Sequence, residues 1–283
     1  MRARPTRVAA ATAVVVSVVA AVVAGSEGSG VAQPSGLRAY GISADGTLMA
    51  TFTTDRPQVL DWVRVIQGFS GDTAAIGLDQ RVQDGLTYLV GNRGGIYRVT
   101  MNPLTLKKVS QLTVALHGTD FGVDFNPAAD RLRITGDGGQ NLRHDLNTHT
   151  TVADTMLTTP PAPGATLGVT AAAYTNNDLN PDTATTLFDV GTSTDQVLVQ
   201  SPANNGTLAP TGRLGVDAAP NAGFDIYTTL NNGKAVSSAG FATLVGPSGT
   251  STLYSVNLLT GAATSTGQFP LAITDIAISL TGS

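Results

Sequence analysis

The chain has 283 residues, enough for one large all-β domain or two average domains, and its 32 glycines and 14 prolines favour strands and turns over helices. Only 13% of the residues are charged, the net charge is −4, and no cluster of Lys and Arg is interleaved with aromatic residues, which excludes a nucleic-acid partner. The absence of cysteine excludes disulfides and a catalytic thiol.

The first 32 residues are typical of an export segment rather than of a fold. Arg2, Arg4 and Arg7 precede an apolar run from Val8 to Ala24, and small residues end that run. We therefore expect residues 1–32 to be a signal peptide and linker. The protein would be secreted to the extracellular space or the cell envelope, with no membrane span after cleavage. An uncleaved anchor is the alternative, because the apolar run is near the lower limit for crossing a bilayer.

A short strand of small residues recurs five times along the rest of the chain. The copies are Ile76–Asp79, Phe121–Phe125, Thr170–Tyr174, Gly223–Ile226 and Asp275–Ile278. Successive copies among the first four start about 45 to 52 residues apart, and a period of about 40 to 50 residues is typical of propellers and repeat arrays. Each of these four copies is followed by further strand patterns separated by turns, which indicates four strands per copy.

The fifth copy stands almost at the C-terminus, and the strands that would complete its sheet lie at the other end of the sequence. These are Leu37–Ile42, Thr47–Phe52 and Asp61–Val65. A last strand that completes a sheet begun by the first strands closes a ring and removes unpaired sheet edges. We therefore expect one all-β domain over residues 37–280, a β-propeller of five four-stranded blades. Six blades are the alternative if residues 153–168 or 243–251 contain an extra hairpin.

The second copy begins the densest block of turn and strand signals. Phe121–Phe125 runs into an Asn126-Pro127 turn, where proline disfavours helix. A hairpin follows, in which Arg131–Ile134 alternates polar and apolar residues and Gly136–Gly139 supplies the turn into Asn141–Arg143.

At these residues the chain resembles a family of uncharacterised, mostly bacterial secreted proteins, catalogued as domain of unknown function 4394. The resemblance covers about Leu37 to Ile278 and is carried chiefly by Gly122–Pro127, Gly139–Arg143, Ala172–Asn177 and Leu253–Leu258. The first repeat departs most, with Gln80–Gln83 where the pattern favours a proline-containing turn. The resemblance implies a propeller-like fold and no established activity.

Three of the five copies carry an aspartate at one position: Asp79, Asp124 and Asp225. The innermost strand of a propeller blade lines the channel, so the three carboxylates are expected to converge there. They would then bind a cation such as calcium, or act as acid and nucleophile in glycoside cleavage. We favour the alternative, in which each aspartate satisfies backbone donors of its own blade.

Charge is concentrated in the arginines of the second copy. Alternation places Arg131 and Arg133 on one strand face, and Arg143 and Asn141 lie on the partner strand, a pattern that suits an anionic or sugar ligand. The favoured alternative is that the arginines pair with aspartates across an exposed hairpin, namely Asp130, Asp137 and Asp145. The candidate ligand-binding residues are therefore these four and the three aspartates of the repeat.

Two further patterns carry weaker signals. Asp178-x-Asn180-x-Asp182, with Asp189 at the twelfth position, has the ligand spacing of a calcium loop, but an Asn/Asp-rich hairpin loop is the preferred interpretation. His144 and His149 flank a predicted turn and are expected at the surface. We therefore assign no cofactor and no metal ligand, with calcium as the alternative.

No catalytic motif is present: there is no G-x-S-x-G elbow, Walker loop or H-E-x-x-H. We assign no catalytic residue and expect a monomeric, non-enzymatic binding or scaffolding module of the cell envelope or extracellular space. Its partner would be a glycan, a small molecule or an envelope protein. The alternative is an extracellular carbohydrate-active hydrolase or lyase that uses the channel aspartates.

Overall fold

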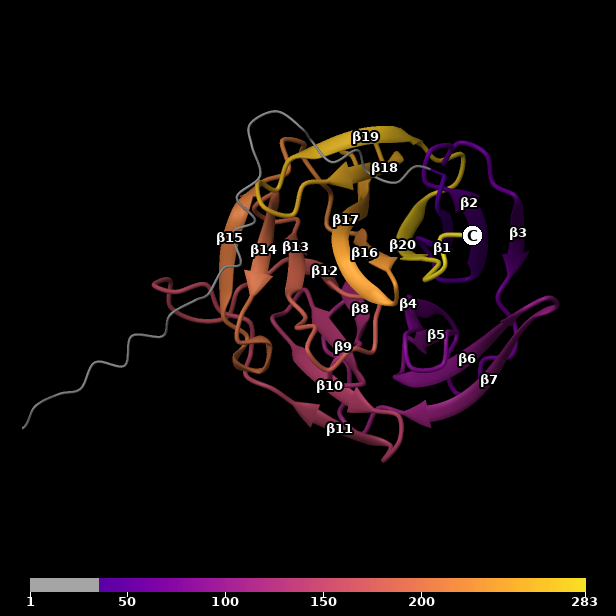
Figure 1. Ribbon diagram of the computed structural model, residues 1–283, viewed down its shortest axis with the longest axis horizontal. Helices are drawn as coiled ribbons and strands as arrows, with labels where there is room; N and C mark the ends of the chain where they lie inside the picture. The colour runs from indigo at the N-terminus through magenta and orange to yellow at the C-terminus, as the bar shows by residue number, and fades with distance from the viewer. Residues whose placement is uncertain (1–35) are drawn as a thin grey trace, which may run out of the picture. The chain divides into compact units, whose positions relative to one another are not determined.

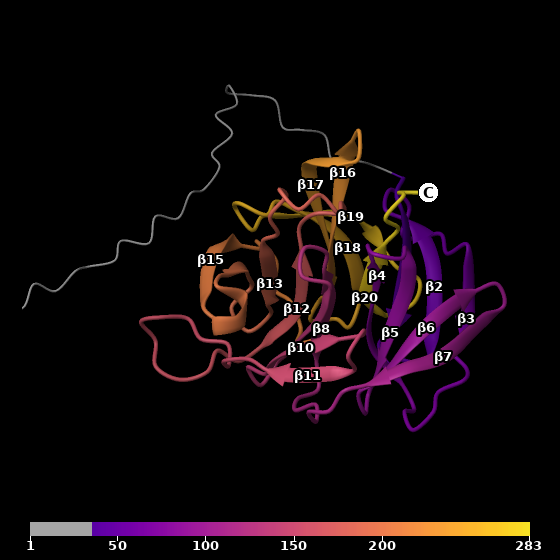
Figure 2. The ribbon, with the colours of Figure 1, turned by 60° about the horizontal axis from the view of Figure 1, so that its bottom comes forward.

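Five four-stranded antiparallel sheets surround a common axis in the computed structural model, which describes residues 36–283 (Figure 1). These residues belong to one unit, 33–283. Figure 2 shows the sheets from the side, as blades that stand next to one another around the ring. The predicted five-bladed β-propeller is confirmed. The expected signal peptide and linker, 1–32, lie outside the described residues.

The innermost strand of each blade corresponds to one of the five predicted copies. These strands are β4 (Ala75–Arg81), β8 (Phe121–Asn126), β12 (Val169–Tyr174), β16 (Ala222–Asn231) and β20 (Ile273–Ile278). The second strands are β5 (Leu86–Gly91), β9 (Arg131–Gly136), β13 (Leu187–Gly191), β17 (Lys234–Val245) and β1 (Arg38–Ser43). The third strands are β6 (Gly95–Met101), β10 (Asn141–Asp145), β14 (Gln196–Gln200), β18 (Ser251–Val256) and β2 (Leu48–Thr53). The outermost strands are β7 (Leu104–Gln111), β11 (Thr150–Ala153), β15 (Leu208–Arg213), β19 (Ala263–Gln268) and β3 (Trp62–Val65).

We number the blades by the order in which their outer strands occur. Blade 1 is β20-β1-β2-β3, and blades 2 to 5 are β4–β7, β8–β11, β12–β15 and β16–β19. Blade 1 joins the two ends of the described chain, since Ala39 pairs with Ile278 and Ile42 with Asp275. The predicted ring closure is confirmed. The six-bladed alternative is excluded, because neither 153–168 nor 243–251 adds a hairpin.

The small residues of the innermost strands allow these strands to approach one another closely. A Cβ added at Gly122 would lie 2.4 Å from the backbone nitrogen of Ala172 on the next blade, and one added at Gly223 would lie 2.4 Å from the Cα of Asp275. Both contacts are with backbone, which cannot rotate away. Glycine at these positions therefore sets the diameter of the inner ring.

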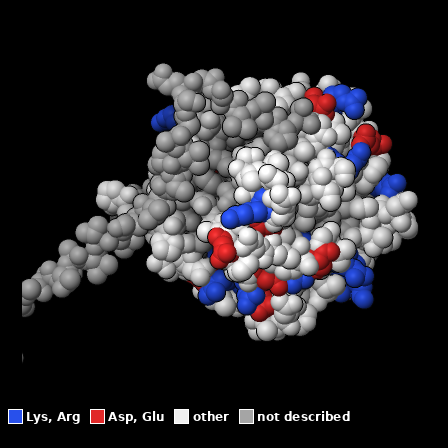
Figure 3. All heavy atoms as spheres, viewed as in Figure 1, with Lys and Arg blue, Asp and Glu red and all other residues white. Residues whose placement is uncertain are grey.

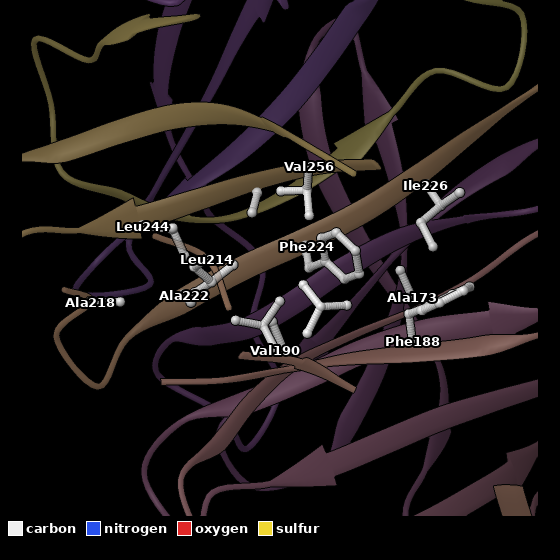
Figure 4. Packing of buried hydrophobic residues seen from close by; sticks show 13 residues of the cluster. Ala173, Phe188, Val190, Leu214, Ala218, Ala222, Phe224, Ile226, Leu244 and Val256 are labelled. Atoms are coloured by element: carbon white, nitrogen blue, oxygen red, sulfur yellow. The ribbon is translucent and has the colours of Figure 1, made fainter. Parts of the chain in front are cut away.

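Apolar side chains fill four of the five interfaces between neighbouring blades. Between blades 4 and 5, for example, Val190, Phe224 and Leu244 belong to one buried cluster (Figure 4). Comparable clusters lie between blades 5 and 1, 2 and 3, and 1 and 2. Between blades 3 and 4, in contrast, the buried apolar residues form two small groups, of four and three residues, and all but Leu157 belong to blade 4. Few apolar residues therefore pack at this interface, in contrast to the other four.

Charged side chains of both signs lie close together over β9–β11 on the face shown in Figure 3. The only helical segment in residues 36–283 is the short 3₁₀ turn η1 (Ala203–Asn205), next to the same region. No helix in this described part of the chain is long and apolar enough to span a bilayer.

Candidate functional site

Four buried aspartates lie on the innermost strands. Asp79 (β4), Asp124 (β8) and Asp225 (β16) each contribute a carboxylate oxygen to a group whose members lie within 4.8 Å of one another. The predicted convergence of these three carboxylates therefore occurs. The fourth, Asp275 on β20, stands two residues before the repeated position, at which this blade has Ala277.

Each of the four carboxylates accepts a backbone N–H from a neighbouring blade. The donors are Phe125 to Asp79 (2.7 Å), Tyr174 to Asp124 (3.0 Å), Leu78 to Asp275 (2.8 Å) and Ile278 to Asp225. Asp79 and Asp225 also accept the N–H of the residue that follows each of them, at 2.6 and 2.5 Å. The structural role favoured from the sequence is thus present. The sequence predicted donors within each aspartate's own blade, and Asp79 and Asp225 have them. All four aspartates also bond to a neighbouring blade, so they join each of these blades to its neighbour.

Burial raises the pKa of all four carboxyls. The pKa of Asp225 rises to about 6, and those of Asp79, Asp124 and Asp275 rise well above their usual range. Repulsion among the group adds to the effect of burial at Asp79 and Asp124. No Lys, Arg or His within residues 36–283 forms an ion pair with any of the four.

The three converging carboxylates line a cavity of about 10 Å³, which is about the room that one water molecule needs. Asn176, which follows β12 and is 4% exposed, lines the same cavity. Its Oδ1 accepts the N–H of Asp178 at 2.8 Å. Its Nδ2 is buried and has no hydrogen-bond partner among the described residues.

A second polar group fills the interface between blades 3 and 4. Its centre is Arg133 on β9, which is 3% exposed. Within blade 3 and the loop after it, the guanidinium donates to Asn141 Oδ1 (2.7 Å) and Asp154 Oδ2 (2.8 Å). On blade 4 it donates to the Tyr174 hydroxyl (3.2 Å) and Asn204 Oδ1 (2.7 Å). Arg133 therefore joins the two blades with buried, charged hydrogen bonds.

Asp154 is shared by two arginines. Arg143 lies directly opposite Arg133 in the β9–β10 register, and its Nε donates to Asp154 Oδ1 at 2.9 Å. Arg131 forms a separate ion pair with Asp145 at 3.0 Å. Three guanidinium groups thus form ion pairs with two carboxylates, and Asp130 and Asp189 also interact electrostatically with Arg131 and Arg133.

These side chains border a cavity of about 220 Å³ that is lined by Asn126, Ala129, Arg131, Arg133, Arg143, Tyr174, Ala203 and Asn204. Arg143 is about one-third exposed at its edge, whereas Arg133 is buried at its wall. Tyr174 contributes to this cavity and to the small cavity of the aspartates. The two sites are therefore neighbours at one end of the propeller.

Buried polar atoms without partners are concentrated at the same interface. Among the described residues, seven buried side-chain polar atoms have no hydrogen bond, and four belong to Thr135, Asp189 and Gln200. Gln200 contacts Asn141 across the interface through its amide nitrogen (3.3 Å), and strand register puts Asp189 on the same face of its sheet as Gln200. Burial raises the pKa of Asp189 well above its usual range, and Arg133 opposes the shift.

The predictions for the arginine set have mixed outcomes. The pairing of Arg131 with Asp145 is confirmed. The prediction that this hairpin is exposed is wrong at Arg133 and Asn141. These residues are 3% and 2% exposed, because blade 4 packs against them. Asp130 instead pairs with Arg81 of blade 2 at 2.6 Å.

The sequence analysis did not identify four residues around Arg133. Three of them, Asp154, Tyr174 and Asn204, accept hydrogen bonds from Arg133, and the fourth, Asp189, interacts with it electrostatically. Only Tyr174 belongs to one of the repeated strands, and the four residues lie 21 to 71 positions from Arg133. Asp275 was also missed, although a shift of two residues within the fifth copy would have brought it into the aspartate series.

The expected surface position is confirmed for His149, which is exposed, and is wrong for His144. His144 is fully buried rather than at the surface, and its Nε2 lies 2.8 Å from Ser110 Oγ on β7. His149 Nδ1 lies 2.9 Å from the same hydroxyl. Burial, with a smaller contribution from His149, lowers the pKa of His144 to about 4.

The segment with calcium-loop spacing forms a loop held by its own side chains. Asp178 accepts the N–H groups of Asn180 (2.9 Å) and Ala235 (2.6 Å), and Asn180 accepts that of Asp182 (2.9 Å). Asp189, the twelfth position, lies within strand β13. These bonds agree with the preferred interpretation, an Asn/Asp-rich loop.

Comparison with known sequences gives one match. Residues 48–277 match the model of a family described as Domain of unknown function (DUF4394). No curated protein matches the chain.

Several solved structures are similar to this propeller at low identity. Myxococcus xanthus glutaminyl cyclase is 13% identical, with a TM-score of 0.43, over 84% of this chain and 95% of that one. An auxiliary nutrient binding protein from Bacteroides thetaiotaomicron is 10% identical, with a TM-score of 0.44, over 88% and 71%. A protein of unknown function from the same organism is 13% identical, with a TM-score of 0.47, over 88% and 68%. At these values the similarity carries no argument about function.

Proposed function

The chain belongs to the family of the domain of unknown function DUF4394, and from that premise we propose that it is a secreted, non-enzymatic binding protein. Its ligand is a small molecule, or the end of a larger one, that carries a carboxylate or a similar anion. The binding site is the cavity of about 220 Å³ between blades 3 and 4. The proposal for export rests on the basic front and apolar run of residues 2–24.

The observation that carries the proposal is the convergence of three arginines on one cavity in a chain with few charges. Asp145 and Asp154 form ion pairs with them, but the charged side chains that line the cavity itself are all arginines, so the cavity attracts anions. Arg143 uses Nε for Asp154, and its two terminal nitrogens are available for the forked hydrogen bonds that guanidinium groups make with carboxylates.

The rest of the site suits a small polar ligand. Arg133 is held by four acceptors, so it meets a ligand without first losing much conformational freedom. Asn126, Asn204 and Tyr174 supply amide and hydroxyl groups at the wall, and Ala129 and Ala203 supply methyl groups. The volume is below the roughly 300 to 1,000 Å³ of drug-sized pockets, which favours a single acidic sugar or a short carboxylic acid.

The hydrolase or lyase alternative receives less support. The channel aspartates share a cavity of about 10 Å³, and each already accepts backbone N–H groups. A space for about one water molecule does not admit a sugar ring between an acid and a nucleophile.

Titration calorimetry with glucuronate, and with glucose as its neutral counterpart, tests the proposal on the purified protein. The two sugars differ at one carbon, which carries a carboxylate only in glucuronate. Glucuronate is expected to bind, more weakly as salt is added, and glucose is not. Arg143→Gln removes a charged hydrogen bond worth about 1.5–3 kcal/mol, so it should weaken binding about tenfold to a hundredfold.

Arg98→Gln is the matched control, since Arg98 is exposed on β6 and does not line the cavity. It should bind glucuronate like the wild type. Equal binding of the two sugars, or an Arg143→Gln protein that binds as well as the control, would refute the proposal. So would a lack of binding for glucuronate, phosphate and citrate alike.

A further inference from the structure

The hydrogen-bonding groups around the cavity between blades 3 and 4 indicate which class of ligand it accepts. Its charged side chains are Arg131, Arg133 and Arg143, which have N–H donors and no acceptor. The other polar side chains that line it are Asn126, Tyr174 and Asn204. Each of these three has both a donor and an acceptor, so the direction of its hydrogen bonds decides what it offers to a ligand.

The acceptor atoms of the two amides are already used. Asn126 Oδ1 accepts the backbone N–H groups of Ala128 and Ala129, both at 3.0 Å. Asn204 Oδ1 accepts a guanidinium N–H of Arg133 at 2.7 Å. These donors fix the orientation of each amide, because an amide nitrogen cannot accept them. Asn204 Nδ2 therefore remains as a donor, and it has no partner among the described residues.

The Tyr174 hydroxyl is also left as a donor. Its oxygen accepts the Nε–H of Arg133 at 3.2 Å and a hydrogen bond from Asn126. Burial raises the pKa of Tyr174, so the hydroxyl keeps its proton. Both lone pairs of the oxygen are occupied, and the proton has no acceptor within residues 36–283.

The backbone carbonyls and the carboxylates of this region have donors of their own. Ala203 O accepts two side-chain amides, at 3.0 and 2.6 Å, and Ala129 O accepts Arg131 at 3.1 Å. Asp145 and Asp154 pair with the arginines and do not line the cavity. A ligand therefore meets free donors and no free acceptor among the side chains that line the cavity.

Hydroxyl and ammonium groups suit such a cavity poorly. Each brings an O–H or N–H that finds no acceptor among the lining side chains, and an unpaired donor weakens binding. An ammonium group is also repelled by the three arginines. A carboxylate, in contrast, has acceptors only, and guanidinium groups bind it with paired hydrogen bonds.

The free donors come from both blades. Arg131 and Arg143 belong to β9 and β10 of blade 3, whereas Tyr174 and Asn204 belong to β12 and η1 of blade 4. A ligand with an acceptor group at each end reaches both sets. The cavity of about 220 Å³ is several times the roughly 30 Å³ that one water molecule occupies in the liquid, and two alanines of its lining supply methyl groups for a short carbon chain.

Given the proposed function, on which this inference rests, we propose that the cavity binds a short dicarboxylate without hydroxyl or amino groups, such as succinate. One carboxylate binds Arg131 and Arg143 of blade 3. The other accepts hydrogen bonds from the Tyr174 hydroxyl and Asn204 Nδ2 of blade 4. The ligand thereby joins the two blades across the cavity.

Titration calorimetry at pH 7 compares succinate with probes that each change one property. Butyrate lacks the second carboxylate, malate adds a hydroxyl group and aspartate adds an ammonium group. Each change should weaken binding about tenfold, since one lost charged hydrogen bond or one unpaired donor has an effect of that order. Glucuronate, with several hydroxyl groups, and phosphate, a single oxyanion, should also bind more weakly than succinate.

Asn204→Asp tests the contribution of blade 4. Asn204 is exposed in η1, and the new side chain keeps an oxygen for Arg133 but replaces the free donor by a negatively charged acceptor. Succinate should bind to this variant about tenfold more weakly or worse. Asn205→Asp is the matched control, because Asn205 is also exposed and its replacement adds the same charge, but it does not line the cavity. It should change the succinate affinity less than about threefold, since water and salt screen the charge.

The outcomes separate this proposal from the function on which it rests. If glucuronate or phosphate binds as tightly as succinate, the dicarboxylate is the wrong class and the anion site stands. The same holds if butyrate, malate or aspartate binds as tightly as succinate, or if both variants lose the same succinate affinity. If succinate, glucuronate, phosphate and citrate all fail to bind, the proposed function itself is wrong.

Discussion

Replacement of Asp154 by asparagine isolates the energetic contribution of the charge shared by Arg133 and Arg143. Asp154 is 5% exposed and Arg133 is 3% exposed, so water screens this pair little. Asp154→Asn removes the negative charge and leaves Arg133 buried with neutral acceptors only, namely Asn141, Asn204 and Tyr174.

The expected cost follows from this geometry. Removal of one partner of a buried ion pair costs about 3–5 kcal/mol. The new amide still offers one oxygen to the arginines, and Arg133 keeps its other acceptors, so we expect about 2–3 kcal/mol. A protein of this size loses about 2–4 °C in melting temperature per kcal/mol, which gives a decrease of roughly 5–10 °C.

Thermal and urea unfolding followed by circular dichroism measure this change. Asp61→Asn is the control, because Asp61 pairs with Arg38 at 2.6 Å but both side chains are more than one-third exposed. Exposed pairs contribute about 0–1 kcal/mol, so the control should lose less than about 4 °C. If both variants lost the same stability, the argument that the interface between blades 3 and 4 depends on buried charge would be wrong.

Three other perturbations test separate parts of the structure by denaturant titration. The pKa of His144 is lowered to about 4, so between about pH 6.5 and pH 4 the unfolded chain binds a proton that the folded chain does not. Stability should therefore fall by about 3 kcal/mol through that window, and His144→Gln should remove this decrease. The pKa of buried Asp189 is raised, so as pH rises above about 4 the unfolded chain loses this proton before the folded chain does. Asp189→Asn should therefore stabilise the folded protein more at pH 8 than at pH 5. An equal effect at both pH values would contradict the raised pKa of Asp189. Gly122→Ala places a Cβ 2.4 Å from a backbone nitrogen and should cost about 1–3 kcal/mol, whereas Gly138→Ala, whose nearest neighbour is 3.9 Å away, should be nearly neutral.

The repeat made the fold predictable from sequence. The five copies of small residues coincide with the five innermost strands, and the strands at Leu37 to Val65 pair with Asp275–Ile278 as the closure of a ring requires. The same regularity predicted the convergence of Asp79, Asp124 and Asp225, because equivalent positions of neighbouring blades meet at the axis.

The contacts of Arg133 were not predictable in this way. Its partners Asp154, Tyr174 and Asn204 lie on two blades and in two loops, and no period relates them. The alternation of polar and apolar residues in β9 placed Arg133 on the correct face of the strand. It did not show that blade 4 packs against that face, because burial of a charged side chain depends on tertiary contacts that local pattern does not record.

The pairing of Ala39 with Ile278 has a consequence for the time at which the protein can fold. The innermost strand of blade 1 follows all the other strands of the ring in the sequence, so the outer strands of this blade are made before the strand that completes it. Contacts between such distant positions form slowly, because the loop-closure entropy must be overcome before the contact stabilises the chain. The ring of blades therefore remains open until β20 has been made and has paired with β1.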